Sequence, residues 1–307
     1  MYDIIIIGGG PAGLTAGLYA TRARLKTLLI ESYTVPSQAV VTASIENYPG
    51  FPEGIDGFGL IDKFKKQAEK FGLEFSVGNV KGIQETKDGW QVVVDDTTHN
   101  CLSLIIASGS RPKELVVPGE AKFRGRGVSY CATCDGALFK DKHIVVVGGG
   151  NTAVEEALFL TRFGKKVTLI HRRDRLRATQ ILQERVLAHE KIDFVWSSQV
   201  VEILGNESVE ALKVKNINTQ QESKIQCNGV FIFVGLIPNT DFLKGIIKLD
   251  ETGYIVTDDN MKTSTTGVFA CGDCRKKLLR QVVTACADGA IAAFSAQQYV
   301  EELKGIA

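Results

Sequence analysis

The chain has 307 residues, of which 44% are hydrophobic and 23% charged, with a formal net charge of +1. This composition is ordinary for a globular protein, and the length suits two domains. The near-zero charge argues against a nucleic-acid partner, which normally brings a basic surplus. The first residues enter an apolar run without a basic segment, and no apolar run is long enough to cross a bilayer. We therefore expect no secretory signal, no membrane association and a cytoplasmic location.

The first expected elements are a strand at 4–7, a glycine turn at 8–13 followed by an Ala/Leu-rich helix, and a second strand at 27–30. An amphipathic helix at 62–72, antiparallel strands over 75–94 and a buried strand at 104–109 come next. The first part of this order then returns. Ile4-Ile-Ile-Ile-Gly-Gly-Gly-Pro-Ala-Gly13 reappears as Ile144-Val-Val-Val-Gly-Gly-Gly-Asn-Thr-Ala153, followed by strands at 167–170 and 230–235. The sequence therefore predicts an α/β chain with two Rossmann-like, three-layer ββα dinucleotide-binding domains.

The C-terminal tail carries a strand-like segment at 267–273 and a helical stretch at 279–303. These residues fit the first fold better than a third domain, because about 60 residues make a marginal core. The second fold is thus expected to be inserted in the first. We place the first domain at 1–116 and 245–307 and the second at 117–244, with linkers at 112–119 and 238–245.

Gly8, Gly10 and Gly13 lie between a strand and a helix, where a dinucleotide fingerprint is found. The first glycine permits the tight turn, the second lets backbone approach a pyrophosphate, and the third allows close helix–strand packing. The helix N-terminus favours the anion. Gly148, Gly150 and Ala153 repeat the pattern, with Ala as a tolerated variant of the third glycine.

The two copies differ where a dinucleotide is selected. Glu31 follows Gly8 by 23 positions and suits the hydroxyls of a ribose, whereas the equivalent position in the second copy opens the run His171-Arg-Arg-Asp-Arg-Leu-Arg177. A carboxylate repels a 2′-phosphate, while guanidinium groups bind it with charge-assisted hydrogen bonds. The first domain is therefore expected to bind FAD and the second NADPH.

Seven cysteines, an odd and scattered set, do not suit the disulfide framework of a secreted protein. Two C-x-x-C spacings occur, at Cys131/Cys134 and Cys271/Cys274. No histidine is near either pair in sequence to complete four zinc ligands, so we expect no metal. The first pair should begin a helix, which lowers a thiol pKa, and Asp135 could exchange a proton with the departing thiolate. We expect the second pair to pack as small apolar residues beside the cofactor, the alternative being an auxiliary disulfide beside the ribityl chain.

With these motifs in place, the whole chain resembles the low-molecular-weight, bacterial-type thioredoxin reductases. The likeness is carried by Gly8–Gly13, Glu46-Asn-Tyr-Pro-Gly50, Cys131-Ala-Thr-Cys-Asp135, Gly148–Ala153, the His171-Arg-Arg run, Gly272-Asp273 and Arg280-Gln281. The resemblance implies that NADPH reduces FAD, that FAD reduces the Cys131–Cys134 disulfide, and that these thiols reduce thioredoxin. It further implies that Cys134 faces the flavin, that the more exposed Cys131 attacks thioredoxin, and that Asp135 is the acid/base. A homodimer is also expected.

Fingerprint and resemblance together give two sets of expected cofactor residues. Those for FAD are Gly8, Gly10, Pro11, Ala12, Gly13, Glu31, Gln38, Asn47, Val80, Gly109, Gly272, Asp273, Arg280, Gln281 and Val282. Those for NADPH are Gly148, Gly150, Asn151, Thr152, Ala153, His171, Arg172, Arg173 and Arg177.

The sequence departs from the family pattern near Gln38, where Pro36-Ser37 replace two glycines and Val40, Val41 and Ala43 replace a threonine-rich stretch. Leu236 also stands where the family has a histidine. Alternatives that remain open are ferredoxin as the electron donor, a reductase that serves a peroxidase, a dithiol oxidase, and a non-catalytic nucleotide-sensing module. The fingerprint and arginine run favour NADPH over ferredoxin, and the C-x-x-C pair argues against a module that only binds.

Overall fold

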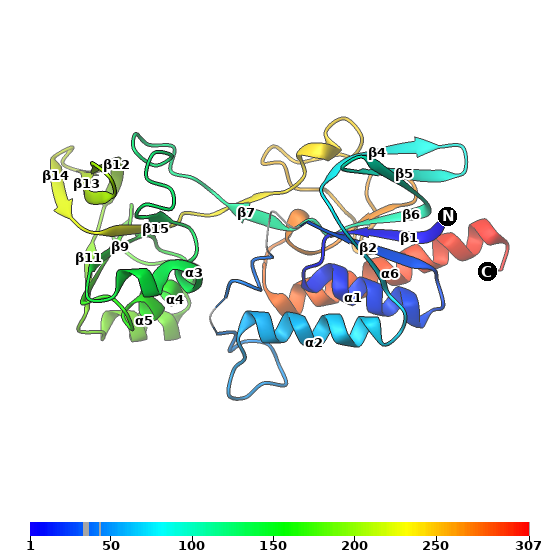
Figure 1. Cartoon of the computed structure of the whole chain (residues 1–307), viewed down its shortest axis with the longest axis horizontal. Helices are drawn as coiled ribbons and strands as arrows, with labels where there is room; N and C mark the ends of the chain where they lie inside the picture. The colour runs from blue at the N-terminus through cyan, green and yellow to red at the C-terminus, as the bar shows by residue number, and fades with distance from the viewer. Residues whose placement is uncertain (33–36, 43, 307) are drawn as a thin grey trace. The chain divides into compact units, whose positions relative to one another are not determined.

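The computed structural model describes residues 1–32, 37–42 and 44–306. The chain forms two compact units (Figure 1), one from Met1–Arg111 and Ile237–Ala307, the other from Pro112–Leu236. The prediction of two Rossmann-like folds, the second inserted in the first, is confirmed. No helix in the described ranges is long and apolar enough to span a bilayer.

The first unit is built on a seven-stranded sheet in which parallel strands are continued by an antiparallel meander. The parallel strands are β3 (Glu74–Val77), β2 (Thr27–Glu31), β1 (Tyr2–Ile7), β6 (Thr97–Ile106) and β17 (Val268–Ala270). The antiparallel strands β4 (Val80–Thr86) and β5 (Gly89–Val94) pair through the first half of β6. The expectation of antiparallel strands over 75–94 is therefore right for β4 and β5 and wrong for β3, which pairs with β2 in parallel.

Three helices belong to this unit: α1 (Pro11–Arg22), α2 (Gly57–Glu69) and α6 (Val282–Lys304). Alternate residues of β1 explain the layering, since Ile4 and Ile6 pack with α1 and α6 while Ile5 and Ile7 pack on the opposite face. Because both faces of such strands are buried, their sequences are continuous runs of apolar residues. Helix α2 begins five positions before the expected residue 62, because the Asp56 side chain caps it by accepting the Gly59 N–H at 2.8 Å.

The second unit has three layers. Its parallel sheet has the order β11 (Ile192–Val195), β10 (Lys166–Ile170), β9 (His143–Gly148), β15 (Gly229–Phe233) and β8 (Val128–Ser129). One face carries the helices α3 (Ala132–Asp135), α4 (Asn151–Leu160) and α5 (Gln180–Leu187), and the other an antiparallel sheet of β12 (Ser198–Gly205), β13 (Val209–Asn216) and β14 (Glu222–Gln226) (Figure 1). Successive side chains of β9 point to opposite faces of the parallel sheet and so join the layers. Val146 packs toward α4, and Val145 packs toward β12 and β13.

The chain passes between the units at 111/112 and 236/237, a few residues before the bounds 116/117 and 244/245 expected from the sequence. At these crossings β7 (Ser110–Pro112) pairs with β16 (Leu236–Pro238) in a two-stranded sheet. The Pro- and Gly-containing segments that suggested the bounds extend beyond this pair. Short 3₁₀ turns complete the elements at η1 (Gly136–Phe139), η2 (Asp241–Leu243) and η3 (Gly272–Cys274).

Candidate active site

The first fingerprint forms a turn between β1 and α1 that only glycine can make. Gly8 has φ +118°, and a Cβ there would overlap the Ala107 carbonyl. A Cβ on Gly13 would overlap the Gly8 carbonyl oxygen, so α1 packs directly on the turn. Glycine adopts this backbone conformation without the steric cost that other residues meet.

The N-terminus of α1 is suited to an anion. The N-cap is Gly10, which has no side chain to cap the first N–H groups, and Pro11 is the first helical residue. Pro11 and Ala12 therefore stand where backbone can approach a pyrophosphate. Glu31 lies over the same turn, because a Cβ on Gly9 would be 2.8 Å from the Glu31 carboxyl carbon.

A second part of this site comes from the chain after β17. Gly272 has φ +76°, and a Cβ there would be 2.8 Å from the Ala12 Cβ, so the turn at Gly272–Asp273 lies against the start of α1. Asp273 Oδ1 and Arg280 Nε are buried and make no hydrogen bond to any residue that the structure describes. The Arg280 guanidinium lies 4.1 Å from the centroid of the Tyr254 ring. Buried polar atoms need partners, and the hydroxyls and ring of a flavin nucleotide would supply them.

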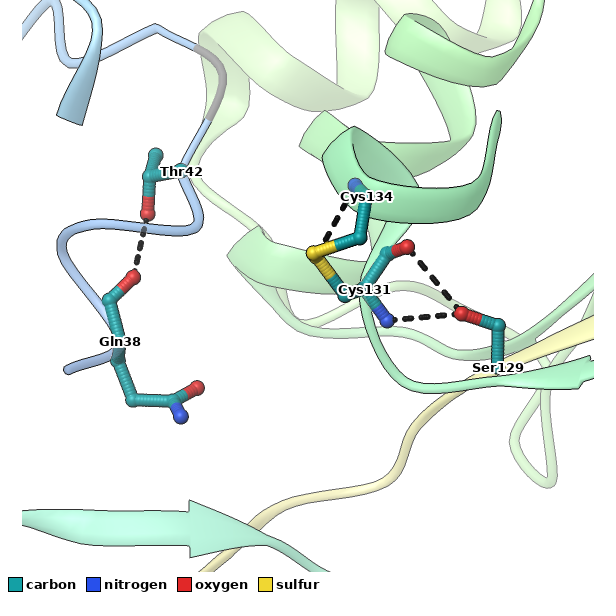
Figure 2. Close-up of a disulfide and its surroundings, with 5 residues drawn as sticks. All are labelled: Gln38, Thr42, Ser129, Cys131 and Cys134. Atoms are coloured by element: carbon teal, nitrogen blue, oxygen red, sulfur yellow. Dashed lines mark hydrogen bonds between the residues drawn. A yellow bond between two sulfur atoms is a disulfide. The ribbon is translucent and has the colours of Figure 1, made fainter. Parts of the chain in front are cut away.

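Asn47 and Gln281, far apart in sequence, meet here: the Asn47 amide donates to Gln281 Oε1 at 3.0 Å. Gln281 is the N-cap of α6 and forms a capping box with Thr284, so Val282 is the first residue of that helix. The Gln38 carbonyl accepts a hydrogen bond from the Thr42 hydroxyl at 2.9 Å (Figure 2). The substituted positions Pro36 and Ala43 lie outside the described residues.

Two further expected residues lie at ends of strands in the same unit. Gly109 follows β6 with φ +64°, and its carbonyl accepts the Asn239 N–H at 3.0 Å. Val80 begins β4 and packs against the core on the face of β1 away from α1. Two residues before Val80, the Gly78 N–H donates to the Glu31 carbonyl at 3.0 Å, which holds the start of β4 near the end of β2. The fifteen residues expected for FAD therefore all belong to the first unit.

The second fingerprint repeats the turn between β9 and α4. Gly148 has φ +154°, and a Cβ there would be 2.6 Å from the Ala153 Cβ, which occupies the place of the third glycine. Gly150 is the N-cap of α4 and lacks a capping side chain. The first turn of α4 holds Asn151, whose side chain accepts the Thr179 N–H at 2.9 Å, and the exposed Thr152.

The His171 ring lies over this turn, where a Cβ on Gly149 would overlap it. His171 is buried, and its Nε2 makes no hydrogen bond within the described part of the chain. Burial, and then Arg177, Arg173 and Arg172, lower the His171 pKa. The Arg177 N–H also donates to the Gly149 carbonyl at 2.7 Å, which anchors the arginine run to the glycine turn.

Arg172, Arg173 and Arg177 are exposed. None of the three forms an ion pair with an acid among residues 1–32, 37–42 and 44–306. Free guanidinium groups beside a dinucleotide turn fit a phosphate on the adenosine ribose.

Cys131 and Cys134 form a disulfide at the start of α3 (Figure 2). Cys131 is the N-cap, and its sulfur accepts the Cys134 N–H at 3.1 Å. The buried Ser129 holds the Cys131 backbone from both sides, accepting its N–H at 3.1 Å and donating to its carbonyl at 3.2 Å. Asp135 is half-buried, and its N–H donates to the Cys131 carbonyl at 3.2 Å.

The order of exposure within this pair differs from the expectation. Cys134 is exposed and Cys131 half-buried, so the expectation that Cys131 is the more exposed thiol is wrong for this structure. The physical reason is the position of Cys131 as the N-cap, where Ser129 and the first turn of α3 surround its backbone and sulfur.

The other five cysteines, all in the described part of the chain, are free. Cys271 and Cys274 are fully buried and pack into the clusters on opposite faces of the first sheet. Burial raises the pKa of both thiols, that of Cys274 to about 11. Their expected role as small apolar residues agrees with this packing. Within the described ranges, no three metal-ligating side chains gather into a cation site.

Sequence reasoning missed two sets of residues. Ser129 gives no signal, because a serine before a C-x-x-C pair has no distinguishing pattern. Arg275, Lys277 and Asp288 form an ion-pair network behind the Gly272–Asp273 turn. Asp288 could have been found from the sequence, because it is an acid in the Ala-rich first half of α6. A charge buried in such a helix is rarely unpaired, so a basic partner could have been expected.

Two dinucleotide turns on parallel sheets, with a C-x-x-C disulfide in the same unit as the second turn, define a nucleotide-dependent disulfide oxidoreductase. The family model described as pyridine nucleotide-disulphide oxidoreductase matches residues 2–289, and the chain belongs to that family.

Within this family the chain groups with the thioredoxin reductases. It is 49% identical to a thioredoxin reductase of Listeria innocua over 99% of this chain and 95% of the relative. It is 48% identical to one from Bacillus subtilis over 99% and 96%. Its fold matches the crystal structure of Lactococcus lactis thioredoxin reductase with a TM-score of 0.96 at 46% identity, covering 98% of this chain and 100% of that one.

Proposed function

We propose that this chain is an NADPH-dependent thioredoxin reductase that carries FAD and reduces the disulfide of thioredoxin through Cys131 and Cys134. The observation that carries the proposal is the Cys131–Cys134 disulfide in the same unit as the second dinucleotide turn. A site that only binds nucleotides has no use for a disulfide there.

The first unit binds FAD and the second NADPH. Glu31 over the first turn suits ribose hydroxyls. Asp273 Oδ1 and Arg280 Nε, which lack a hydrogen bond from the described residues, suit the remainder of a flavin nucleotide. The exposed arginines after β10 suit the 2′-phosphate of NADPH. FAD, when bound, supplies the chemistry that accepts a hydride from NADPH and delivers an electron pair to a disulfide.

The two cysteines carry the electron pair to the protein substrate. Reduction by two electrons breaks the Cys131–Cys134 bond, and the Cys134 N–H directed at the Cys131 sulfur stabilises a thiolate on Cys131. This thiolate attacks one sulfur of the thioredoxin disulfide and forms a mixed disulfide, and the other thioredoxin sulfur leaves as a thiolate. Cys134 then attacks the Cys131 sulfur, which re-forms the internal disulfide and releases reduced thioredoxin.

Asp135 is the proton donor and acceptor for the thiols, because it directly follows Cys134 and is held to Cys131 through its backbone. The flavin site belongs to the first unit, whereas both the disulfide and the nicotinamide belong to the second. Each must reach the flavin in turn, so catalysis requires a rotation of one unit against the other about the crossings near 112 and 236.

Two finer statements complete the proposal. The enzyme is a homodimer, supported by exposed apolar side chains on α1 and α6 of the first unit, namely Tyr19, Val283, Ile291 and Phe294. It works in the cytoplasm, where five free cysteines persist in reduced form.

The test is anaerobic reduction of the bound flavin by NADPH, NADH and reduced ferredoxin in parallel, followed by addition of thioredoxin. Rapid bleaching by NADPH and reoxidation by thioredoxin is the expected result. Bleaching by ferredoxin alone would instead establish a ferredoxin-dependent enzyme, and a flavin that oxygen but not thioredoxin reoxidises through the cysteines would establish a dithiol oxidase.

A further inference from the structure

We propose that Asp288, through Lys277 and Arg275, positions the Gly272–Asp273 turn for FAD before the cofactor binds. Asp288 is thus a positioning residue rather than a contact of the flavin. The inference rests on the proposed assignment of FAD to the first unit.

One carboxylate on α6 satisfies three donors from the segment after β17. Asp288 Oδ2 accepts the Gly272 N–H at 3.1 Å and the Lys277 ammonium at 2.9 Å. Asp288 Oδ1 pairs with the Arg275 guanidinium at 3.3 Å. These bonds fix the beginning and the end of the turn to the same residue, and Asp273 lies between them.

The position of Asp288 is itself determined by helix packing. The next residue is Gly289, where a Cβ would overlap the Ala12 carbonyl oxygen, so α6 approaches α1 closely at this point. Ala12 also meets Gly272. Asp288 therefore connects the N-terminus of α1, which suits the pyrophosphate, to the turn that presents Asp273.

The network is buried and balanced in charge. Asp288 is 7% exposed, and so is the Lys277 side chain. Lys277 also lies 3.8 Å from Asp273, so two carboxylates face two cations. A buried charge that loses its partner is strongly unfavourable, whereas removing both partners of a pair leaves no such charge. Asp273 keeps Oδ1 without a hydrogen bond from the described residues, which leaves that atom for the cofactor.

The network makes specific predictions for FAD affinity. Among the described residues, Asp288→Asn leaves Arg275 without a carboxylate partner and Lys277 with Asp273 as its only one, and the turn should lose its fixed shape. The FAD dissociation constant of the apoprotein should rise at least tenfold. Adding Arg275→Met to Asp288→Asn removes the cation that lost its partner and keeps Lys277 paired with Asp273, so the double variant should recover most of that loss. Lys276→Met, which removes an exposed cation from the same segment, is the matched control and should bind FAD as the wild type does.

The experiment is a fluorescence titration of each apoprotein with FAD, together with the melting temperature of each protein with and without FAD. The inference is wrong if Asp288→Asn binds FAD within twofold of the wild type, or if the double variant binds no better than the single one. Should Asp288→Asn fail to fold, Arg275→Met alone, which leaves a surplus carboxylate, is compared with the double variant on the same criterion. A wild-type apoprotein that binds no FAD would instead overturn the proposed function.

Discussion

Glu31 and His171 hold equivalent positions in the two units, since each side chain lies against the glycine between the first two fingerprint glycines of its unit, Gly9 or Gly149. Each also ends or follows the second strand of its fold, β2 or β10. The same geometry thus presents a carboxylate in one copy and an imidazole, with arginines after it, in the other. We expect the choice between FAD and NADPH to depend on this position of the repeated fold and the residues that follow it.

Replacing Arg172 and Arg173 together by Ala should weaken the binding of NADPH and leave the binding of NADH nearly unchanged. Each hydrogen bond to a charged group contributes about 1.5–3 kcal/mol, so the loss should be several kcal/mol at most. The measurement is the dissociation constant of each nucleotide by calorimetry. Lys224→Ala, an exposed cation on β14, is the control. Equal losses for NADPH and NADH would mean that the arginines do not select the phosphate.

Replacing either Cys131 or Cys134 by Ser should abolish thioredoxin reduction while NADPH still bleaches the flavin, because only the step through the disulfide is removed. Stopped-flow absorbance and a thioredoxin assay separate the two half-reactions. Cys271→Ala, in the buried pair, should keep both. Activity lost in Cys271→Ala but kept in Cys131→Ser would show that the other pair is redox-active.

Glu156 on α4 should make stability depend on pH. Burial, and then the neighbouring Glu155, raise the pKa of its carboxyl from 4.5 to about 7. The folded chain holds this proton more tightly than the unfolded chain, so the stabilisation is present below about pH 4.5 and is lost as the pH rises through about 7. The loss should amount to no more than about 3.5 kcal/mol.

The measurement for Glu156 is the free energy of unfolding by denaturant at several pH values. Glu156→Gln should flatten its decline between about pH 4.5 and 8 relative to the wild type. The control Glu190→Gln changes an exposed acid of the same unit and should keep the wild-type slope. Identical slopes in the wild type and Glu156→Gln would show that this carboxyl does not titrate in that range.

A crosslink that locks the units with Cys134 at the flavin should stop flavin reduction by NADPH and preserve electron exchange between flavin and dithiol. The reason is that nicotinamide and disulfide belong to one unit and need the same flavin centre in turn. Flavin absorbance after mixing with NADPH tests the first half-reaction, and mixing with a small dithiol, which can reach the locked cysteines where a protein cannot, tests the second. Normal turnover by the locked enzyme would show that no rotation is needed.

Local patterns made much of the fold and the site predictable. The glycine turns, the strands after them and the arginine run depend on neighbours in sequence, so they could be read directly. The parallel pairing of β3 could not, because residues 74–77 carry no signal for the strand beside them. The Asp288 network joins α6 to the segment after β17, and only the three-dimensional fold brings these together. The exposure of Cys131 likewise depends on how Ser129 and α3 enclose it.

The burial of Cys271 and Cys274 has a practical consequence for redox titration. Both thiols are free and fully enclosed by the first unit, so reagents in the solvent do not reach them in the folded protein. Cys101 and Cys227 are equally enclosed, and Cys286 is half-buried. A thiol reagent added to the native protein should therefore react first with Cys131 and Cys134, and the number of rapidly modified cysteines directly reports the oxidation state of the working pair.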